Sequence, residues 1–262
     1  MNPKEWSKEH QKLIAEEKRL IKARKQEKTS LVNDTAEKYL PDGMREKLNT
    51  AFIKGFESVF RGGNAMIEKT CRKDLREQEY RINRYTMEEK DRHILAGFKK
   101  SVNRSGRKNM LLSGAEGAVF GILGIGLPDI PVFIAMLLKA IREIALSYGF
   151  SGDNEEEKIF TLKLIRAGIS YGDAFVSENL AVGKQICGID EEPKTLAEEI
   201  QITAEALSER LLYMKFVQGI PIVGLVGGLS DFTVMKEISK YARFAYKKRF
   251  LRTIWKEMGG TP

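Results

Sequence analysis

The sequence predicts an all-α fold, and three observations lead to that prediction. Apolar residues recur at the three- and four-residue spacing of amphipathic helices along most of the chain. No segment shows the sustained alternation of apolar and polar residues that is typical of a strand. Prolines number only 7 among 262 residues, and with 42% hydrophobic residues the chain can bury a sizeable core. We therefore expect a multi-helix bundle.

The first 30 residues are expected to form a charged amphipathic helix that extends from the main domain. Trp6, Leu13 and Leu20 recur at intervals of seven residues, which is the spacing of one narrow apolar stripe. Residues 31–257 are predicted to form a single α-helical domain, followed by a disordered tail over residues 258–262.

Three helices are expected between this extension and the middle of the chain. The first covers residues 44–60, where the apolar positions have helical spacing, and Arg61-Gly62-Gly63-Asn64 ends it. A charged helix should run from Met66 into the mid-80s. Another should cover about residues 87–102.

Two helices joined by a tight turn are expected after Asp129. The first should end near Gly149, because a glycine readily adopts the left-handed conformation that terminates helices. The second should start at Glu155, with acidic residues in its first turn, and a loop is expected over residues 183–193.

The last two helices have the clearest boundaries. Thr195-Leu196-Ala197-Glu198 is a capping-box pattern, and it predicts a helix that reaches Met214. The final helix is predicted over residues 233–257, with an apolar side and a strongly basic side.

Two glycine-rich apolar segments, Ser113–Phe133 and Phe216–Met235, share a Gly-Leu-x-Asp sequence and are predicted to form two central helical hairpin segments. Both contain glycines spaced by four residues, which allow helix backbones to approach closely. A membrane-crossing helix needs about 20 apolar residues, and acidic residues and prolines interrupt the first segment well before that length. We do not expect two full spans. Shallow insertion into lipid and burial in a protein core both stay open.

The distribution of charge is more informative than the net charge of +8. Residues 72–108 hold 12 basic and 6 acidic residues, and residues 236–257 hold 8 basic and 2 acidic. Each basic block adjoins a glycine-rich apolar segment, a combination that anionic lipid attracts. The candidate contacts to a membrane or a partner are Lys99, Lys100, Arg104, Arg107, Lys108, Lys247, Lys248, Arg249 and Arg252. No groove-reading or base-stacking motif accompanies these charges, so specific nucleic-acid binding is not expected.

Motifs that would carry known chemistry are matched only superficially. Residues 168–172 read G-x-S-x-G, but the preceding residues have helical periodicity rather than the strand that a nucleophile elbow requires. The chain has only two histidines, His10 and His93, and its two cysteines are far apart, so neither a metal site nor a cofactor site is predicted. The two cysteines and the polar amino terminus predict a protein of the cytoplasm.

Three acidic residues interrupt apolar sequence and are the only catalytic candidates. Asp129 and Asp231 each stand where a helix is expected to begin, so both have a structural role as helix caps available to them. Glu116 has no such explanation, and an ionised carboxylate in apolar surroundings is costly unless it is paired.

The same segments resemble the EcsC family of bacterial proteins. The resemblance is carried by AEGAVFGILGIGLPDIPVFIAMLLKAIREIALSYGF (Ala115–Phe150) and by FVQGIPIVGLVGGLSDFTVMKEISKYARFAYKKRFL (Phe216–Leu251), and we expect it to cover about residues 31–253. It implies an α-helical protein that is often encoded beside an ABC-transporter pair and has no established biochemical activity.

Two hypotheses about function follow. The first is a non-enzymatic accessory or regulatory protein, peripheral to the inner face of the cell membrane, that contacts anionic lipid or a membrane protein such as an ABC transporter through its basic blocks. The second is a hydrolase-like enzyme or an apolar-ligand carrier with a pocket between the two glycine-rich segments. The sequence specifies neither a substrate nor an oligomeric state.

Overall fold

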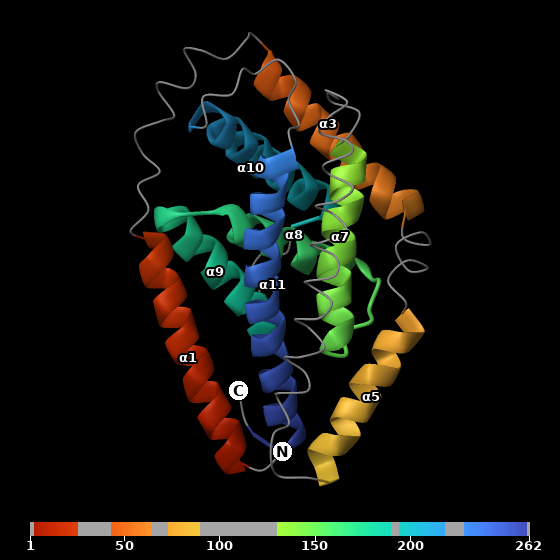
Figure 1. The fold of residues 1–262 in the computed structure, drawn as a ribbon, viewed down its shortest axis with the longest axis vertical. Coiled ribbons are helices and arrows are strands. Elements are labelled where there is room, and N and C mark those ends of the chain that lie inside the picture. Colours follow the sequence, from red (N-terminus) through yellow and green to blue (C-terminus); the bar gives the residue numbers. More distant parts are fainter. Residues whose placement is uncertain are drawn as a thin grey trace.

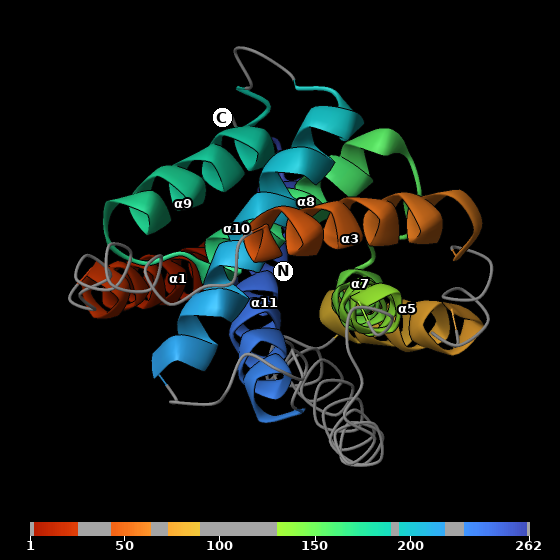
Figure 2. The same cartoon turned by 90° about the horizontal axis from the view of Figure 1, so that it is seen from above.

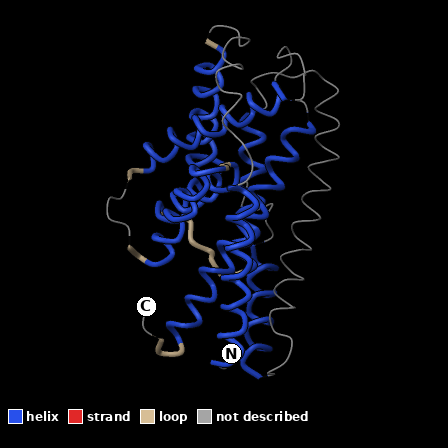
Figure 3. The backbone as a smooth tube through the Cα atoms, turned by 90° about the vertical axis from the view of Figure 1, so that its left-hand side faces the viewer, coloured by secondary structure: helices blue, strands red, loops and turns tan. Residues whose placement is uncertain are grey.

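A computed structural model describes residues 3–25, 43–63, 73–89, 130–189, 194–217 and 228–260. These residues form a helical bundle, and no strand occurs in this part of the chain (Figure 1, Figure 3). The all-α prediction is therefore confirmed for the described residues. The α-helices are α1 (Pro3–Lys25), α3 (Met44–Ser58), α5 (Lys73–Glu89), α7 (Ile130–Ser147), α8 (Glu155–Ile169), α9 (Gly172–Cys187), α10 (Leu196–Val217) and α11 (Gly228–Glu257), with a π-helical turn, η1 (Val59–Gly63), after α3.

The central helices of the bundle are α8 and α11. Helix α8 packs against α9, α10 and α11, while α11 also contacts α1 and α7. Helix α3 lies across one end of the bundle, against α7 and α10 (Figure 2), and α5 packs on α7. Buried aromatic side chains of α11, including Tyr241, Tyr246 and Phe250, fill the space between these layers. Because α11 has neighbours on several sides, it is buried over more of its circumference than its predicted single apolar side suggests.

Helices α8 and α11 approach so closely that only a glycine fits at their crossing. A Cβ atom at Gly168 would lie 2.7 Å from the Cα atom of Ile238, which is backbone and cannot rotate away. Gly168 is the first glycine of the G-x-S-x-G match. Its role is in helix packing, and the motif lies between two helices rather than after a strand.

Helix α1 packs along α9 and α11 instead of extending away from them. Leu13 is buried in the core, and Arg24 is buried at the other end of the helix. The start of α1 lies at the end of α11, where the Trp6 indole Nε1–H donates to the Leu251 carbonyl at 2.8 Å. The predicted amphipathic helix is therefore present, and its apolar stripe faces the bundle.

Several predicted helix boundaries are confirmed. Gly149 follows α7 with a φ of 85°, and a Cβ atom there would also collide with the Tyr80 ring. The Asn154 side chain accepts a hydrogen bond from the Glu157 amide and caps α8. In the capping box, the Thr195 amide donates to Glu198 Oε2 and the Glu198 amide donates to Thr195 Oγ1. The Thr195 hydroxyl also donates to Glu198 Oε2, and the two bonds that the carboxylate accepts from Thr195 lower the pKa of the Glu198 carboxyl.

The predicted start of the last helix and one predicted loop are wrong. Helix α11 begins at Gly228 rather than at residue 233. Residues 183–187 belong to α9 and not to the predicted 183–193 loop, because the helix tolerates Gly183 and ends only at Gly188, which has a φ of 68°. In the tail predicted at 258–262, residues Met258, Gly259 and Gly260 donate backbone hydrogen bonds to the last turn of α11.

Most of both glycine-rich segments lies outside the described residues, which omit 90–129 and 218–227. The predicted hairpins and nearly all of the predicted 87–102 helix therefore have no counterpart in the described part of the chain. Their described ends are helical: Ile130 opens α7, and Gly228 opens α11.

Candidate functional site

The polar side chains that are buried among the described residues form clusters between helices. We describe three clusters that contain both a guanidinium group and a carboxylate, and we name them by their central residues: the Glu157 cluster, the Arg166 cluster and the Tyr171 cluster. Buried charges are costly unless they are paired, so these clusters are the first places to look for chemistry.

The Glu157 cluster lies between α8 and α11. The Glu157 carboxylate accepts hydrogen bonds from Tyr246 Oη at 2.7 Å and from Arg249 Nη1 at 2.6 Å. Arg249 also lies over the rings of Phe150 and Phe160, at 4.4 and 4.8 Å from their centroids. Burial raises the pKa of Tyr246 well above its ordinary value of 10.0, so its hydroxyl stays protonated and donates to the carboxylate.

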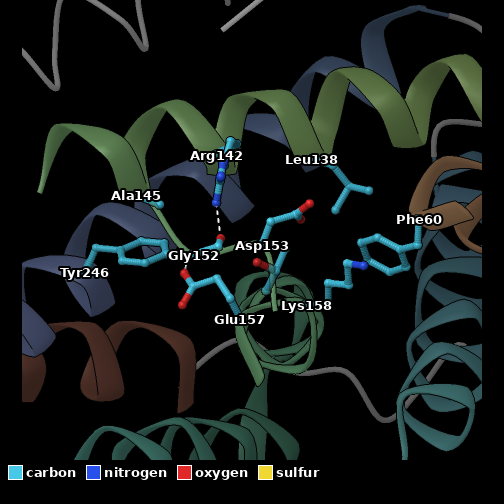
Figure 4. A pocket seen from close by; sticks show the side chains of 10 residues that line it. Phe60, Leu138, Arg142, Ala145, Gly152, Asp153, Glu157, Lys158 and Tyr246 are labelled. Atoms are coloured by element: carbon cyan, nitrogen blue, oxygen red, sulfur yellow. Dashed lines mark hydrogen bonds between the residues drawn. The ribbon is translucent and has the colours of Figure 1, made fainter. Parts of the chain in front are cut away.

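A small pocket adjoins this cluster (Figure 4). Its volume is about 50 Å³, which is room for one or two water molecules. In Figure 4, Arg142 of α7 points toward the loop before α8, where Gly152 and Ser151 offer it their carbonyl oxygens. Lys158 lies over the Phe60 ring on the opposite side. This volume is far below the roughly 300–1,000 Å³ of typical pockets for drug-sized ligands. The Arg142 hydrogen bonds connect α7 to the loop before α8.

The Arg166 cluster ties three helices together through one guanidinium group. Arg166 of α8 donates from Nε to both carboxylate oxygens of Glu178 on α9, at 3.0 and 3.1 Å. Its Nη1 donates to Glu199 and Thr203 of α10. Arg166, Glu199 and Thr203 are almost entirely buried. Replacement of one partner would leave buried charge unpaired, so the cluster fixes the relative positions of α8, α9 and α10.

The Tyr171 cluster joins α1, α10 and α11 at the start of α9. Tyr171 Oη donates to Glu237 Oε1 at 2.6 Å and accepts from Arg210 Nη2 at 3.0 Å. The guanidinium groups of Arg210 and Arg24 lie 4.5 and 5.1 Å from the Tyr171 ring centroid. Burial, reinforced by the bond to Glu237, raises the pKa of Tyr171. A protonated phenol that is held in this way is a poor general base.

Arg24 of α1 is buried against the end of α8. Its Nη1 donates to the carbonyl oxygens of Ala167 and Ser170 at the end of α8, at 3.1 and 2.8 Å. A cation at a helix C-terminus satisfies carbonyls that have no partner in the helix. Burial lowers the pKa of Arg24 from its ordinary value, while nearby Tyr171 and Glu237 oppose that shift.

The four predicted surface cations near the end of α11 all have partners within the chain. Lys247 Nζ lies 3.4 Å from Glu16 Oε2, and Lys248 Nζ lies 2.8 Å from Glu17 Oε1, both in α1. Arg249 belongs to the Glu157 cluster. Arg252 Nη2 donates to the Cys187 carbonyl, the last of α9, at 3.1 Å. Each of these four residues of α11 therefore forms an ion pair or a hydrogen bond with another part of the chain.

The other predicted site residues lie outside the described residues or are described only by their backbone. The first group comprises Glu116, Asp129 and the basic residues Lys99, Lys100, Arg104, Arg107 and Lys108. Asp129 directly precedes the first residue of α7, and the backbone of Asp231 lies in the first turn of α11. The pocket that was predicted between the two glycine-rich segments falls outside the described residues as well.

The serine, cysteine and histidine that the sequence offered for known chemistry are not arranged as a catalytic group among the described residues. Ser170 Oγ donates to the Arg166 carbonyl, one turn back in α8. Cys187 is a free thiol, and the His10 ring stacks on Trp6. Within the described ranges, no group of three or more histidine, cysteine or acidic side chains is placed to hold a metal ion. A search of the same residues finds no helix long and apolar enough to cross a membrane.

The described residues thus form a helical bundle in which buried ion pairs hold the helices to one another. Residues 4–251 match the EcsC protein family, and the chain belongs to that family. The match includes nearly all of α1, which the sequence motifs had placed outside the resemblance. No solved structure gives a significant match.

Two relatives from Bacillus subtilis (strain 168) are similar to part of the chain. Protein EcsC is 23% identical over 146 residues, which is 54% of this chain and 58% of that protein. Uncharacterized protein YdbA is 23% identical over 150 residues, which is 55% of this chain and 54% of that protein. The chain thus spans little more than half the length of these curated relatives.

Proposed function

We propose that this protein is a non-enzymatic accessory protein that acts at the inner face of the cell membrane. In this proposal it binds anionic lipid, or a membrane partner such as an ABC transporter, through basic residues that flank the glycine-rich segments. Membership of the EcsC family is compatible with this role. The names of the two relatives specify no reaction.

The observation that carries the proposal is the basic block of residues 99–108. Five cations stand there without a single acidic residue, directly before the apolar segment Ser113–Phe133. Each cation near an anionic surface contributes about 1 kcal/mol of attraction. The apolar segment can then contribute by burial at the lipid boundary.

The cations of α11 have a secondary role in this proposal. Lys247 and Lys248 are partly neutralised by glutamates of α1, so they add to lipid binding only when α1 shifts. Residues 99–108 therefore make the first contact. This order follows from charge pairing, because a lysine that already faces a carboxylate gains less from a lipid phosphate.

Co-sedimentation with vesicles tests the proposal. The protein should sediment with vesicles that contain phosphatidylglycerol and not with vesicles of phosphatidylcholine alone. Reversal of all five cations (Lys99→Glu, Lys100→Glu, Arg104→Glu, Arg107→Glu and Lys108→Glu) should weaken binding by about a hundredfold or more.

A matched variant controls for net charge. Reversal of five exposed lysines elsewhere, Lys4, Lys18, Lys47, Lys54 and Lys194, changes the net charge by the same amount. This control should retain most of the binding. Equal binding to the two vesicle types, or equal losses in the two variants, would refute a role of residues 99–108 in lipid recognition.

A further inference from the structure

An open groove is lined by residues from the end of α9, the C-terminal half of α11 and α8. Its volume is about 290 Å³. Its lining includes three cations, Arg249, Arg252 and Lys256, and one acidic residue, Glu156. The small pocket beside Arg142 is a separate feature and shares no lining residue with this groove.

The three cations line the groove because of their spacing along α11. Positions 249, 252 and 256 are separated by three and four residues, so their side chains lie on the same face of the helix. The Phe150 and Phe160 rings hold Arg249 from the apolar side. Glu157 neutralises part of the Arg249 charge, which leaves Arg252 and Lys256 as the main source of positive potential.

Two polar atoms in the groove lining are buried and have no hydrogen-bond partner in the described structure. They are Nε of Arg252 and Oε1 of Gln185. Arg252 is held in place because its Nη2 donates to the Cys187 carbonyl, so its Nε–H donor is fixed in position. A buried donor or acceptor without a hydrogen-bond partner destabilises the fold. The groove lining thus contains a donor and an acceptor whose hydrogen-bonding capacity the described residues leave unused.

We infer that this groove binds a phosphate group through Arg252 and Lys256. A phosphate oxygen would accept from Arg252 Nε–H, and the Lys256 ammonium would neutralise further charge. Gln185 Oε1 would accept from a hydroxyl of the ligand, either the P–OH of a monoester or the glycerol hydroxyl of a lipid headgroup. A phosphate monoester carries about −1.5 to −2 charges at neutral pH. The phosphodiester of a lipid headgroup has a single ionised oxygen, so both kinds of phosphate complement the cations of the groove.

The size of the groove restricts the ligand to a small phosphoester. A water molecule occupies about 30 Å³ in the liquid, so the groove has room for about ten. Pockets for drug-sized ligands have volumes of about 300–1,000 Å³. A phosphate with a glycerol-sized substituent fits these limits, and a nucleoside triphosphate exceeds them.

Direct titration of the whole chain tests the inference without any membrane. Inorganic phosphate and glycerol phosphate are the probes, followed by calorimetry and by the ¹H–¹⁵N signals of the arginine side chains. We expect saturable binding with a dissociation constant of about a millimolar or lower. The Arg252 Nε–H signal should shift more than those of arginines remote from the groove.

Two variants test whether Arg252 and Lys256 bind the phosphate. Arg252→Gln removes the fixed donor, and Lys256→Gln removes the charge of an exposed side chain. Each should lower phosphate affinity by about tenfold. Lys240→Gln, an exposed lysine on the same helix, and Arg81→Gln, an exposed arginine on α5, are the matched controls and should leave the affinity unchanged.

Vesicle binding by the Lys256→Gln variant decides whether the phosphate belongs to a lipid headgroup or to a soluble ligand. If Lys256→Gln also weakens binding to phosphatidylglycerol vesicles, and free phosphate competes with them, the ligand is a lipid headgroup. If vesicle binding is unaffected while phosphate titration changes, the ligand is a soluble phosphoester. Either result supports the groove as a phosphate site, whatever residues 99–108 do.

Three results would overturn the inference. One is the absence of saturable binding of either phosphate probe to the wild-type protein. Another is a loss of affinity in Lys240→Gln or Arg81→Gln equal to that in the groove variants. The last is unchanged affinity in Lys256→Gln, a variant that is informative even if Arg252→Gln fails to fold.

Discussion

Trp6 near the start of α1 stacks on Trp255 near the end of α11, with ring centroids 4.2 Å apart and planes inclined by 27°. These are the only two tryptophans in the sequence. The pair connects residues from the two ends of the chain and holds α1 against the bundle. The tryptophan signals of the protein therefore report directly on whether α1 is docked.

Substitution of either tryptophan should abolish the exciton signal of the stacked pair in circular dichroism. Trp6→Phe also removes the hydrogen bond to the Leu251 carbonyl, so it should destabilise the protein by about 1–2 kcal/mol. Trp255→Phe keeps that bond and should cost less. Urea unfolding of the two variants checks the order, and a larger loss in Trp255→Phe would contradict this reading of α1 docking.

The glutamates of α1 should weaken membrane binding by pairing with the lysines of α11. The double variant Glu16→Gln, Glu17→Gln frees Lys247 and Lys248 from two of their partners. We expect it to bind phosphatidylglycerol vesicles about three- to tenfold more tightly than the wild type. The variant Glu46→Gln, Glu205→Gln has the same net charge and changes exposed acids elsewhere. An equal gain in both variants would show that net charge alone, and not release of these lysines, raises the affinity.

A methyl group at Gly168 should force α8 and α11 apart. Gly168→Ala places its Cβ 2.7 Å from the backbone of Ile238, and overpacking of this kind costs about 1–3 kcal/mol. Gly183→Ala in α9 is the matched control, because its nearest neighbour is the flexible end of Lys248 at 3.8 Å. Alanine has the higher helix propensity, so this control should be neutral or stabilising by up to about 1 kcal/mol. Urea unfolding that places the two variants in the opposite order would refute the close approach.

Hydrogen bonding by Tyr246 should make the protein sensitive to alkali. Its pKa is raised in the folded state above the ordinary value of 10.0, so the stability it provides is complete below about pH 10 and is lost as the pH rises further. Tyr246→Phe removes a donor to buried Glu157 and should cost about 1–3 kcal/mol at neutral pH. It should also flatten the loss of stability above pH 10. Tyr213→Phe, at a partly buried tyrosine, is the control, and an unchanged alkaline slope in Tyr246→Phe would contradict the assignment.

Local features of the fold could be predicted from the sequence because they depend on neighbouring residues. The capping box of Thr195 and Glu198 and the left-handed Gly149 are properties of short segments, and both are confirmed. The loop predicted over 183–193 was placed too early, because that prediction also relied on neighbouring residues alone. A glycine inside a helix and a glycine at its end look alike in sequence, and only packing decides that α9 continues to Cys187.

The clusters and the groove could not be predicted because their members are distant in sequence. Lys248 and Glu17 are separated by 231 residues, and Arg166 and Glu199 by 33. Each of these residues reads as an ordinary surface charge until the helices are placed together. The only available signal was the basic spacing of residues 249, 252 and 256, which indicates one charged helix face and not what lies opposite it.

Fractionation of bacterial cells that express the protein tests the proposed membrane role most directly. We expect the protein to sediment with membranes and to be released by high salt, since ionic contacts of exposed groups are screened at high ionic strength. Release should also follow a carbonate wash, as for a peripheral protein. Recovery in the soluble fraction at low salt would contradict the proposal, and so would resistance to both washes.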